Sequence, residues 1–94
     1  SCSIYKTFTD LPNGTYQLSV WAMTNGAQNV LQLYAKNYGG TELNTPITTS
    51  DINWNRFTID EIVVSNNTLE IGVYTVAGAN DWCNLDMFIL RKVD

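Results

Sequence analysis

"TYQLSVWAM", residues 15–23, is the stretch that decides the fold, because apolar and polar side chains alternate along it. Successive side chains of an extended strand point to opposite faces, so each parity of this stretch belongs to one face. One parity is apolar and would face a core, namely Tyr16, Leu18, Val20 and Ala22. The other would face solvent, namely Gln17, Ser19, Trp21 and Met23. This period of two predicts a half-buried β-strand.

The same period recurs along the chain, whereas apolar residues at helical spacing are almost absent. We predict further strands at 3–9, 30–38, 54–64, 69–76 and 83–93, with a short strand near 41–43. A bulge is expected at Asp60-Glu61, because the inward parity changes between Ile59 and Ile62. In the last strand, the parity places four side chains on the core side: Cys83, Leu85, Met87 and Ile89.

These strands predict an all-β fold, a compact, jelly-roll-like β-sandwich of about six to eight antiparallel strands. The chain has 94 residues, which is enough for one small core, so we expect a single domain over residues 1–94. Its start shows no signal peptide, and we expect a module of a larger protein.

The composition excludes several classes of function. There are five lysines and arginines and a net charge of −4, so nucleic acid and anionic membranes are poor partners. No apolar run is long enough to span a bilayer. The chain lacks histidine, and the spacing of Cys2 and Cys83 matches no zinc or redox motif. We therefore predict no metal and no cofactor.

All three tryptophans, Trp21, Trp54 and Trp82, fall on the outward parity of their strands. Exposed aromatic surface on a soluble protein marks a binding site. The negative π face of indole suits the C–H faces of pyranose rings in β-linked glycans. Uncharged partners for the sugar hydroxyls are available in Gln17, Gln32, Tyr34, Asn55 and Tyr74. The alternative is that one of the tryptophans, Trp54 or Trp82 above all, covers the end of the core.

Three stretches resemble carbohydrate-binding modules that are appended to bacterial plant-cell-wall hydrolases: "TFTDLPNGTYQLSVWA" (7–22), "LYAKNYGG" (33–40) and "NDWCNLDMFIL" (80–90). Small size and three tryptophans look most like family 80, from ruminal cellulosomal enzymes. The stretch 33–40 is also similar to family 61, whose modules bind β-1,4-galactan. The family 80 resemblance carries the binding role over to Trp21, Trp54 and Trp82.

The resemblance implies a non-catalytic module for β-mannan, glucomannan, xyloglucan and β-glucan, with β-1,4-galactan as the alternative ligand. It also implies a monomer that is joined to a parent glycoside hydrolase in the same polypeptide, secreted and associated with a cellulosome. Gln32, Tyr34 and Tyr74 would complete the ligand-binding site.

A strand order follows from the jelly-roll resemblance. It places strand 15–23 between strands 30–38 and 69–76, and makes the first and last strands antiparallel neighbours. Trp54 and Trp82 would then flank Trp21 on one platform. Cys2 and Cys83 each open their strand, so they would lie at opposite ends of this antiparallel pair, which favours free thiols over a disulfide.

Two other classes of function were weighed. A glycosidase would need a carboxylate pair, such as Asp81 with Asp86 or Asp60 with Glu61. A sandwich of this size has no deep cleft for such a pair, so we expect no enzyme. A structural or protein-interaction sandwich, which would also use aromatic side chains at its contacts, stays open.

Overall fold

The computed structural model describes residues 4–24, 30–47, 54–76 and 83–94. Seven strands lie in these ranges: β1 (Ile4–Phe8), β2 (Gly14–Thr24), β3 (Val30–Lys36), β4 (Leu43–Pro46), β5 (Asn55–Val64), β6 (Leu69–Val76) and β7 (Cys83–Lys92). No helix that could cross a membrane is found in the described part of the chain. The predicted all-β fold is confirmed, and the short strand lies slightly later than expected.

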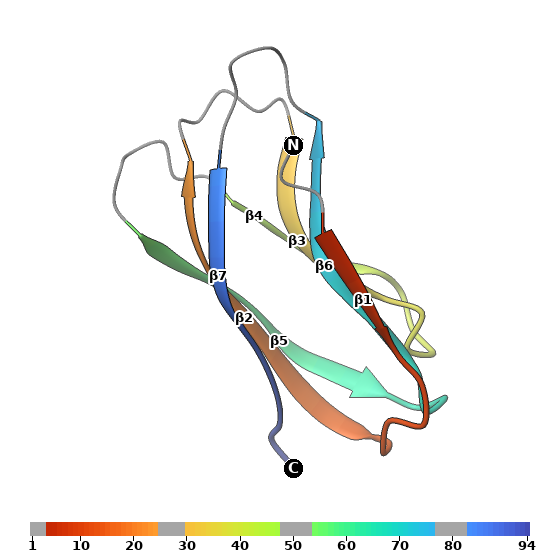
Figure 1. Ribbon diagram of the computed structural model, residues 1–94. Helices are drawn as coiled ribbons and strands as arrows, with labels where there is room; N and C mark the ends of the chain where they lie inside the picture. Colours follow the sequence, from red (N-terminus) through yellow and green to blue (C-terminus); the bar gives the residue numbers. More distant parts are fainter. Residues whose placement is uncertain (1–3, 25–29, 48–53, 77–82) are drawn as a thin grey trace.

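The strands form two antiparallel sheets that face each other, with the order β1-β6-β3-β4 in one and β5-β2-β7 in the other (Figure 1). Apart from the link between β3 and β4, each connection carries the chain from one sheet to the other. The predicted strand order is therefore wrong. β2 pairs with β5 and β7 rather than with β3 and β6, and β1 pairs with β6 while β7 belongs to the opposite sheet.

The core lies between the two sheets and is built from their inward parities. In β2 the apolar parity is buried as predicted, and Leu18, Val20 and Ala22 are completely inaccessible to solvent. Leu33 of β3 and Val73 of β6 face them from the other sheet. Full burial of each large aliphatic side chain contributes roughly 1.5–3 kcal/mol, so this shared core holds the two sheets together.

The expected bulge in β5 is present. Leu18 pairs with Ile59 and Tyr16 with Ile62, so Asp60 and Glu61 together oppose the single residue between Tyr16 and Leu18. Glu61 has a φ of 57°, the left-handed conformation that absorbs the extra residue. The bulge returns Ile62 to the core, where it is fully buried.

A second bulge, in β7, was not predicted. Ser19 pairs with Ile89 and Trp21 with Asp86, so two β7 residues oppose one residue of β2. Met87 takes a φ of 53° at this point. The expectation that Met87 and Ile89 face the core is wrong, because the bulge reverses the parity and leaves them 57% and 44% exposed. Their neighbours Phe88 and Leu90 pack against the core instead.

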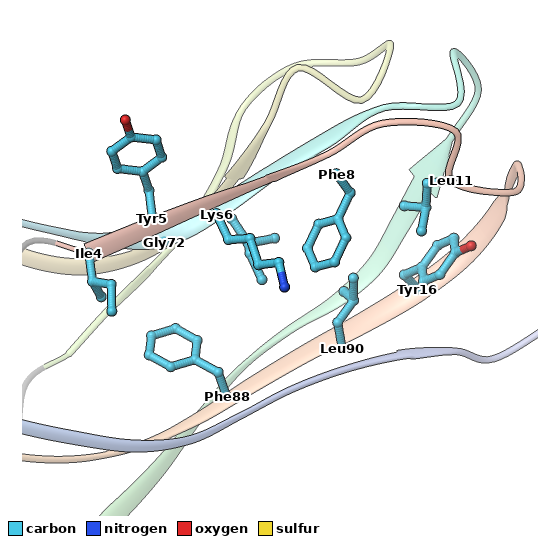
Figure 2. A pocket seen from close by; sticks show the side chains of 10 residues that line it. Ile4, Tyr5, Lys6, Phe8, Leu11, Tyr16, Gly72, Phe88 and Leu90 are labelled. Atoms are coloured by element: carbon cyan, nitrogen blue, oxygen red, sulfur yellow. The ribbon is translucent and has the colours of Figure 1, made fainter.

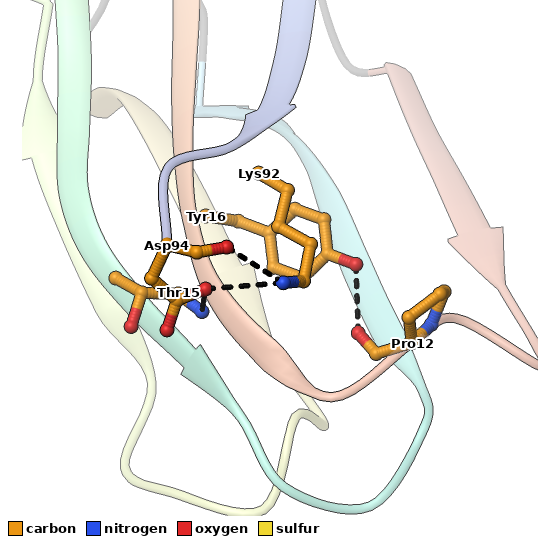
Figure 3. Close-up of polar contacts among 5 residues, drawn as sticks. All are labelled: Pro12, Thr15, Tyr16, Lys92 and Asp94. Atoms are coloured by element: carbon orange, nitrogen blue, oxygen red, sulfur yellow. Dashed lines mark hydrogen bonds and ion pairs between the residues drawn. The ribbon is translucent and has the colours of Figure 1, made fainter.

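The start of β2, at the end farthest from Trp21, is bonded to the last residues of β7 and to Asp94 (Figure 3). The Asp94 carboxylate accepts a hydrogen bond from the Thr15 N–H at 2.9 Å and lies 3.3 Å from Lys92 Nζ. The Tyr16 hydroxyl donates to the Pro12 carbonyl at 2.7 Å. The hydrogen bond from the Thr15 N–H lowers the pKa of Asp94 below its usual range, and the hydrogen bond from Lys92 contributes to the same shift. The contacts of Asp94 with Thr15 and Lys92 link the start of β2 to the end of β7.

Candidate functional site

Trp21 lies on the outer face of the β5-β2-β7 sheet. Its neighbours in sequence, Val20 and Ala22, point into the core, and Trp21 itself is half-buried. Arg56 of β5 and Asp86 of β7 are its partners on the two adjacent strands, and both are exposed. The indole is therefore flanked by a cation on one side and an anion on the other. It does not belong to the core cluster formed by the described residues.

Trp54 lies immediately before β5 and is 43% exposed. It precedes Arg56 by two residues, so the alternation of an extended chain places it on the same side of the sheet as Trp21. We call the surface formed by Trp21, Trp54 and Arg56 the tryptophan face. The predicted outward position of these two tryptophans agrees with the structure.

Two predictions fall outside the described residues. Trp82 precedes β7 and is not described, so its role in binding stays a prediction. Cys2 is likewise not described, so the expectation that Cys2 and Cys83 are free thiols stays a prediction.

Gln32, Tyr34 and Tyr74 lie on the outer face of the other sheet. Gln32 and Tyr34 alternate with the buried Leu33 of β3, and Tyr74 of β6 pairs with Gln32. Asn44 of β4 completes this row, because its side-chain oxygen accepts a hydrogen bond from Gln32 Nε2 at 3.2 Å. The core separates these residues from the tryptophans, since the faces of a sandwich lie on opposite sides of two packed sheets.

As a candidate ligand-binding residue, Tyr34 was expected to be exposed to solvent, but the structure corrects this expectation. It points outward and is only 8% exposed. Its ring lies over Gly72 of β6, where an added Cβ would come within 2.9 Å of Tyr34 Cε2. The absence of a side chain at Gly72 thus creates the space that the tyrosine fills.

Hydrogen bonding fixes the Tyr34 ring in place. Its hydroxyl donates to Glu70 Oε2 at 2.7 Å, and Lys36 Nζ lies 3.8 Å from the same oxygen. The ammonium group of Lys36 also lies 5.3 Å from the centre of the Tyr34 ring. Burial, reinforced by Glu70, raises the pKa of Tyr34 well above its usual range. The phenol therefore stays protonated and continues to donate its hydrogen bond to Glu70.

Beside Tyr34 is a shallow hollow of about 240 Å³. It is lined by Gln32, Tyr34, Lys36, Glu42 and Tyr74. Tyr74 is 50% exposed, so part of its side chain is open to solvent. We call the surface around this hollow the tyrosine face.

The six residues predicted to bind ligand therefore do not form one site. Trp21 and Trp54 share one outer face, Gln32, Tyr34 and Tyr74 share the opposite one, and Trp82 is not described. The sequence pattern identified outward positions correctly. It carried no signal of which sheet each strand would join.

Gln17, which was considered as a partner for sugar hydroxyls, is already engaged. Its Nε2 donates to Asp60 at 2.6 Å, and Arg91 donates to its Oε1 at 3.2 Å. This chain of contacts links β5, β2 and β7 across the sheet. We assign Gln17 to the structure of the sheet.

Of the carboxylates weighed for a hydrolytic pair, Asp81 lies outside the described residues, and Asp60 and Asp86 each accept a hydrogen bond. Asp60 accepts the hydrogen bond from Gln17, and Asp86 accepts one from the N–H of Met87 at 2.8 Å within the β7 bulge. Among the described residues, no three acidic or cysteine side chains are grouped so that they could hold a metal ion.

A cleft of about 630 Å³ opens where the free edges of the two sheets, β1 and β7, face each other (Figure 2). Phe8 points into it from β1, and Phe88 and Leu90 from β7. Lys6 Nζ also lies there, 5.1 Å from the centre of the Phe8 ring. The walls are mainly aliphatic and aromatic, so they offer few partners for the hydroxyls of a sugar.

The fold is a small β-sandwich with two outward aromatic faces, and it is similar to that of a solved carbohydrate-binding module. The solved structure of the module TmCBM61 in complex with β-1,4-galactotriose superposes on this chain with a TM-score of 0.85 and 26% sequence identity. The match covers 97% of this chain and 62% of that module, so the chain spans less than two thirds of its length. No protein-family model and no curated protein sequence matches the chain.

Proposed function

We propose that this chain is a non-catalytic module that binds a β-linked polysaccharide on the tryptophan face. The observation that carries the proposal is the exposed indole of Trp54 beside the outward Trp21, on a sandwich similar to a module solved with a bound galactan oligosaccharide. Indole rings bury the C–H faces of sugars, and Arg56 and Asp86 at the rim supply hydrogen-bonding groups of opposite charge.

We take β-1,4-galactan as the first candidate ligand, because the similar module was solved with β-1,4-galactotriose. β-Mannan, glucomannan, xyloglucan and β-glucan form the second group, on the family 80 resemblance. In either case the module would hold a glycoside hydrolase of the same secreted polypeptide close to its polymer, by raising the effective concentration of substrate.

Calorimetric titration with galactotriose, mannotriose and cellotriose tests the proposal. A shallow, preformed surface should bind with a Kd on the order of 10⁻⁵ M. Replacement of Trp54 by alanine should weaken binding by roughly 1–3 kcal/mol, by analogy with base–aromatic stacking. Because the ligand is neutral, the affinity should change little with salt concentration.

Val63→Ala is the matched control. Val63 is an exposed apolar residue of β5, the strand that follows Trp54, and pairs with Thr15 at the end of β2 far from Trp21. The control should bind like wild type. Equal affinities for Trp54→Ala and wild type, with both proteins folded, would remove the tryptophan face as the site.

A further inference from the structure

We propose that the tyrosine face is a second carbohydrate-binding surface that takes a single sugar ring, so that one module binds glycan on both of its outer faces. This inference rests on the proposed function and extends it to a site on the opposite sheet. Four features of the tyrosine face carry the proposal: a rigid floor, open aromatic rings, a balanced polar rim and a size that fits one ring.

The floor is rigid before any ligand arrives. Tyr34 fills the space over Gly72 and is held by its hydrogen bond to Glu70. Lys36 contacts both the carboxylate of Glu70 and the ring of Tyr34. A surface that is already ordered loses little conformational entropy on binding, which favours recognition of a small ligand.

Two further tyrosines leave their rings open on this face. Tyr74 is 50% exposed and lines the hollow, and Tyr5 is 71% exposed. Tyr5 pairs with Gly72 from the β1 side. It is one of the residues that line the cleft between the sheets, but Figure 2 shows its ring pointing away from the other lining side chains. The tyrosine face thus offers open aromatic surface on which the C–H face of a pyranose can stack.

The polar rim of the hollow suits a neutral ligand that carries hydroxyl groups. Lys36 and Glu42 line it with opposite charges, and Gln32 is oriented by its hydrogen bond to Asn44. Ammonium, carboxylate and amide groups together donate and accept hydrogen bonds. An anionic or cationic ligand would meet one like charge in the hollow.

The size of the hollow limits the ligand to one ring. Its volume of about 240 Å³ lies below the ~300 Å³ at which pockets for drug-sized ligands begin. A terminal sugar or a single-residue branch fits this limit better than a stretch of polymer does.

A chemical-shift titration of the 94-residue chain tests the proposal, with methyl β-galactoside, methyl β-mannoside and β-1,4-galactotriose as probes. At least one methyl glycoside should shift the backbone amides around Gln32 and Tyr74. Tyr74→Ala should weaken that binding roughly tenfold, as expected for the loss of one stacked ring. Trp54→Ala should leave it unchanged while weakening galactotriose binding at the tryptophan face.

Val76→Ala is the matched control, because Val76 is also an outward, exposed residue of β6 and does not line the hollow. Melting curves establish that each variant is folded. Shifts confined to the tryptophan face, or equal binding by Tyr74→Ala and wild type, overturn the second site. If Tyr74→Ala abolishes all glycan binding and Trp54→Ala has no effect on it, the tryptophan face is not the binding site. The proposed function is then assigned to the wrong face, and the two-face proposal fails with it. If only the tryptophan face binds, the proposed function stands alone.

Discussion

Gly72 decides the character of the tyrosine face at the scale of a single residue. A Cβ at this position would come within 2.9 Å of both Cε2 and Oη of Tyr34 and would collide with the backbone oxygen of Ile4. Any other residue would therefore have to displace either Tyr34 or strand β1. The outward side of β6 is flat at this point because Gly72 has no side chain.

Tyr34 should ionise above the ordinary pH range of a tyrosine. Its folded pKa is raised, so the protonated phenol contributes stability that is complete below the ordinary value of about 10 and is lost as the pH rises through the folded value. In an alkaline titration of tyrosinate absorbance, we expect a step from Tyr34 that comes only with unfolding.

Tyr34→Phe should remove that delayed step and no other. The substitution also leaves Glu70 without its hydroxyl donor, so a small loss of stability, about 1 kcal/mol, should accompany it. A delayed step that persists in Tyr34→Phe would assign the raised pKa to another tyrosine.

At the scale of the element, β7 depends on its bulge. Without the extra residue at Met87, the strand would keep one parity and bring Met87 and Ile89 inward in place of Phe88 and Leu90. The bulge needs a left-handed backbone at a residue that has a side chain, which costs roughly 1–2 kcal/mol. The gain is the packing of Phe88 and Leu90 against the core.

Two substitutions at Met87 test whether the strand holds a left-handed residue at this position. Met87→Gly should be tolerated, because glycine adopts positive φ freely, whereas β-branched Met87→Val should be less stable than the glycine variant by about 1–2 kcal/mol. Urea denaturation measures the difference. If valine proves as stable as glycine, the strand does not hold a left-handed residue at this point.

At the scale of the whole molecule, one core stabilises both sheets. Leu33→Ala in β3 should therefore cost about 2–5 kcal/mol, a large part of the 5–15 kcal/mol that is typical of a folded domain. Leu33 belongs to one sheet and Trp21 to the other. Tryptophan fluorescence and far-ultraviolet circular dichroism should then report the same lowered midpoint.

Trp54→Ala serves as the comparison, since an exposed side chain outside the core should change stability by no more than about 0.5 kcal/mol. Separate midpoints for the two probes in Leu33→Ala would mean that the sheets unfold independently. The open cleft between β1 and β7 makes this a real test, because along that edge Phe8 and Phe88 are only half-buried.

The sequence by itself determined what is local. The alternation in residues 15–23 predicted the buried side of β2, and the change of parity between Ile59 and Ile62 predicted the β5 bulge. Outward positions for Trp21 and Tyr74 followed from the same period. Each of these depends on neighbours along the chain, which the sequence displays directly.

Only the tertiary structure decided which strands share a sheet, and with that which outward residues share a face. Both sheets bury their inward side chains in the same core, so alternation looks alike in either sheet and gives no sheet membership. The bulge at Met87 and the burial of Tyr34 over Gly72 depend on partners far away in sequence. For this reason the described residues that were predicted to bind ligand separate into a tryptophan face and a tyrosine face on opposite sides of one sandwich.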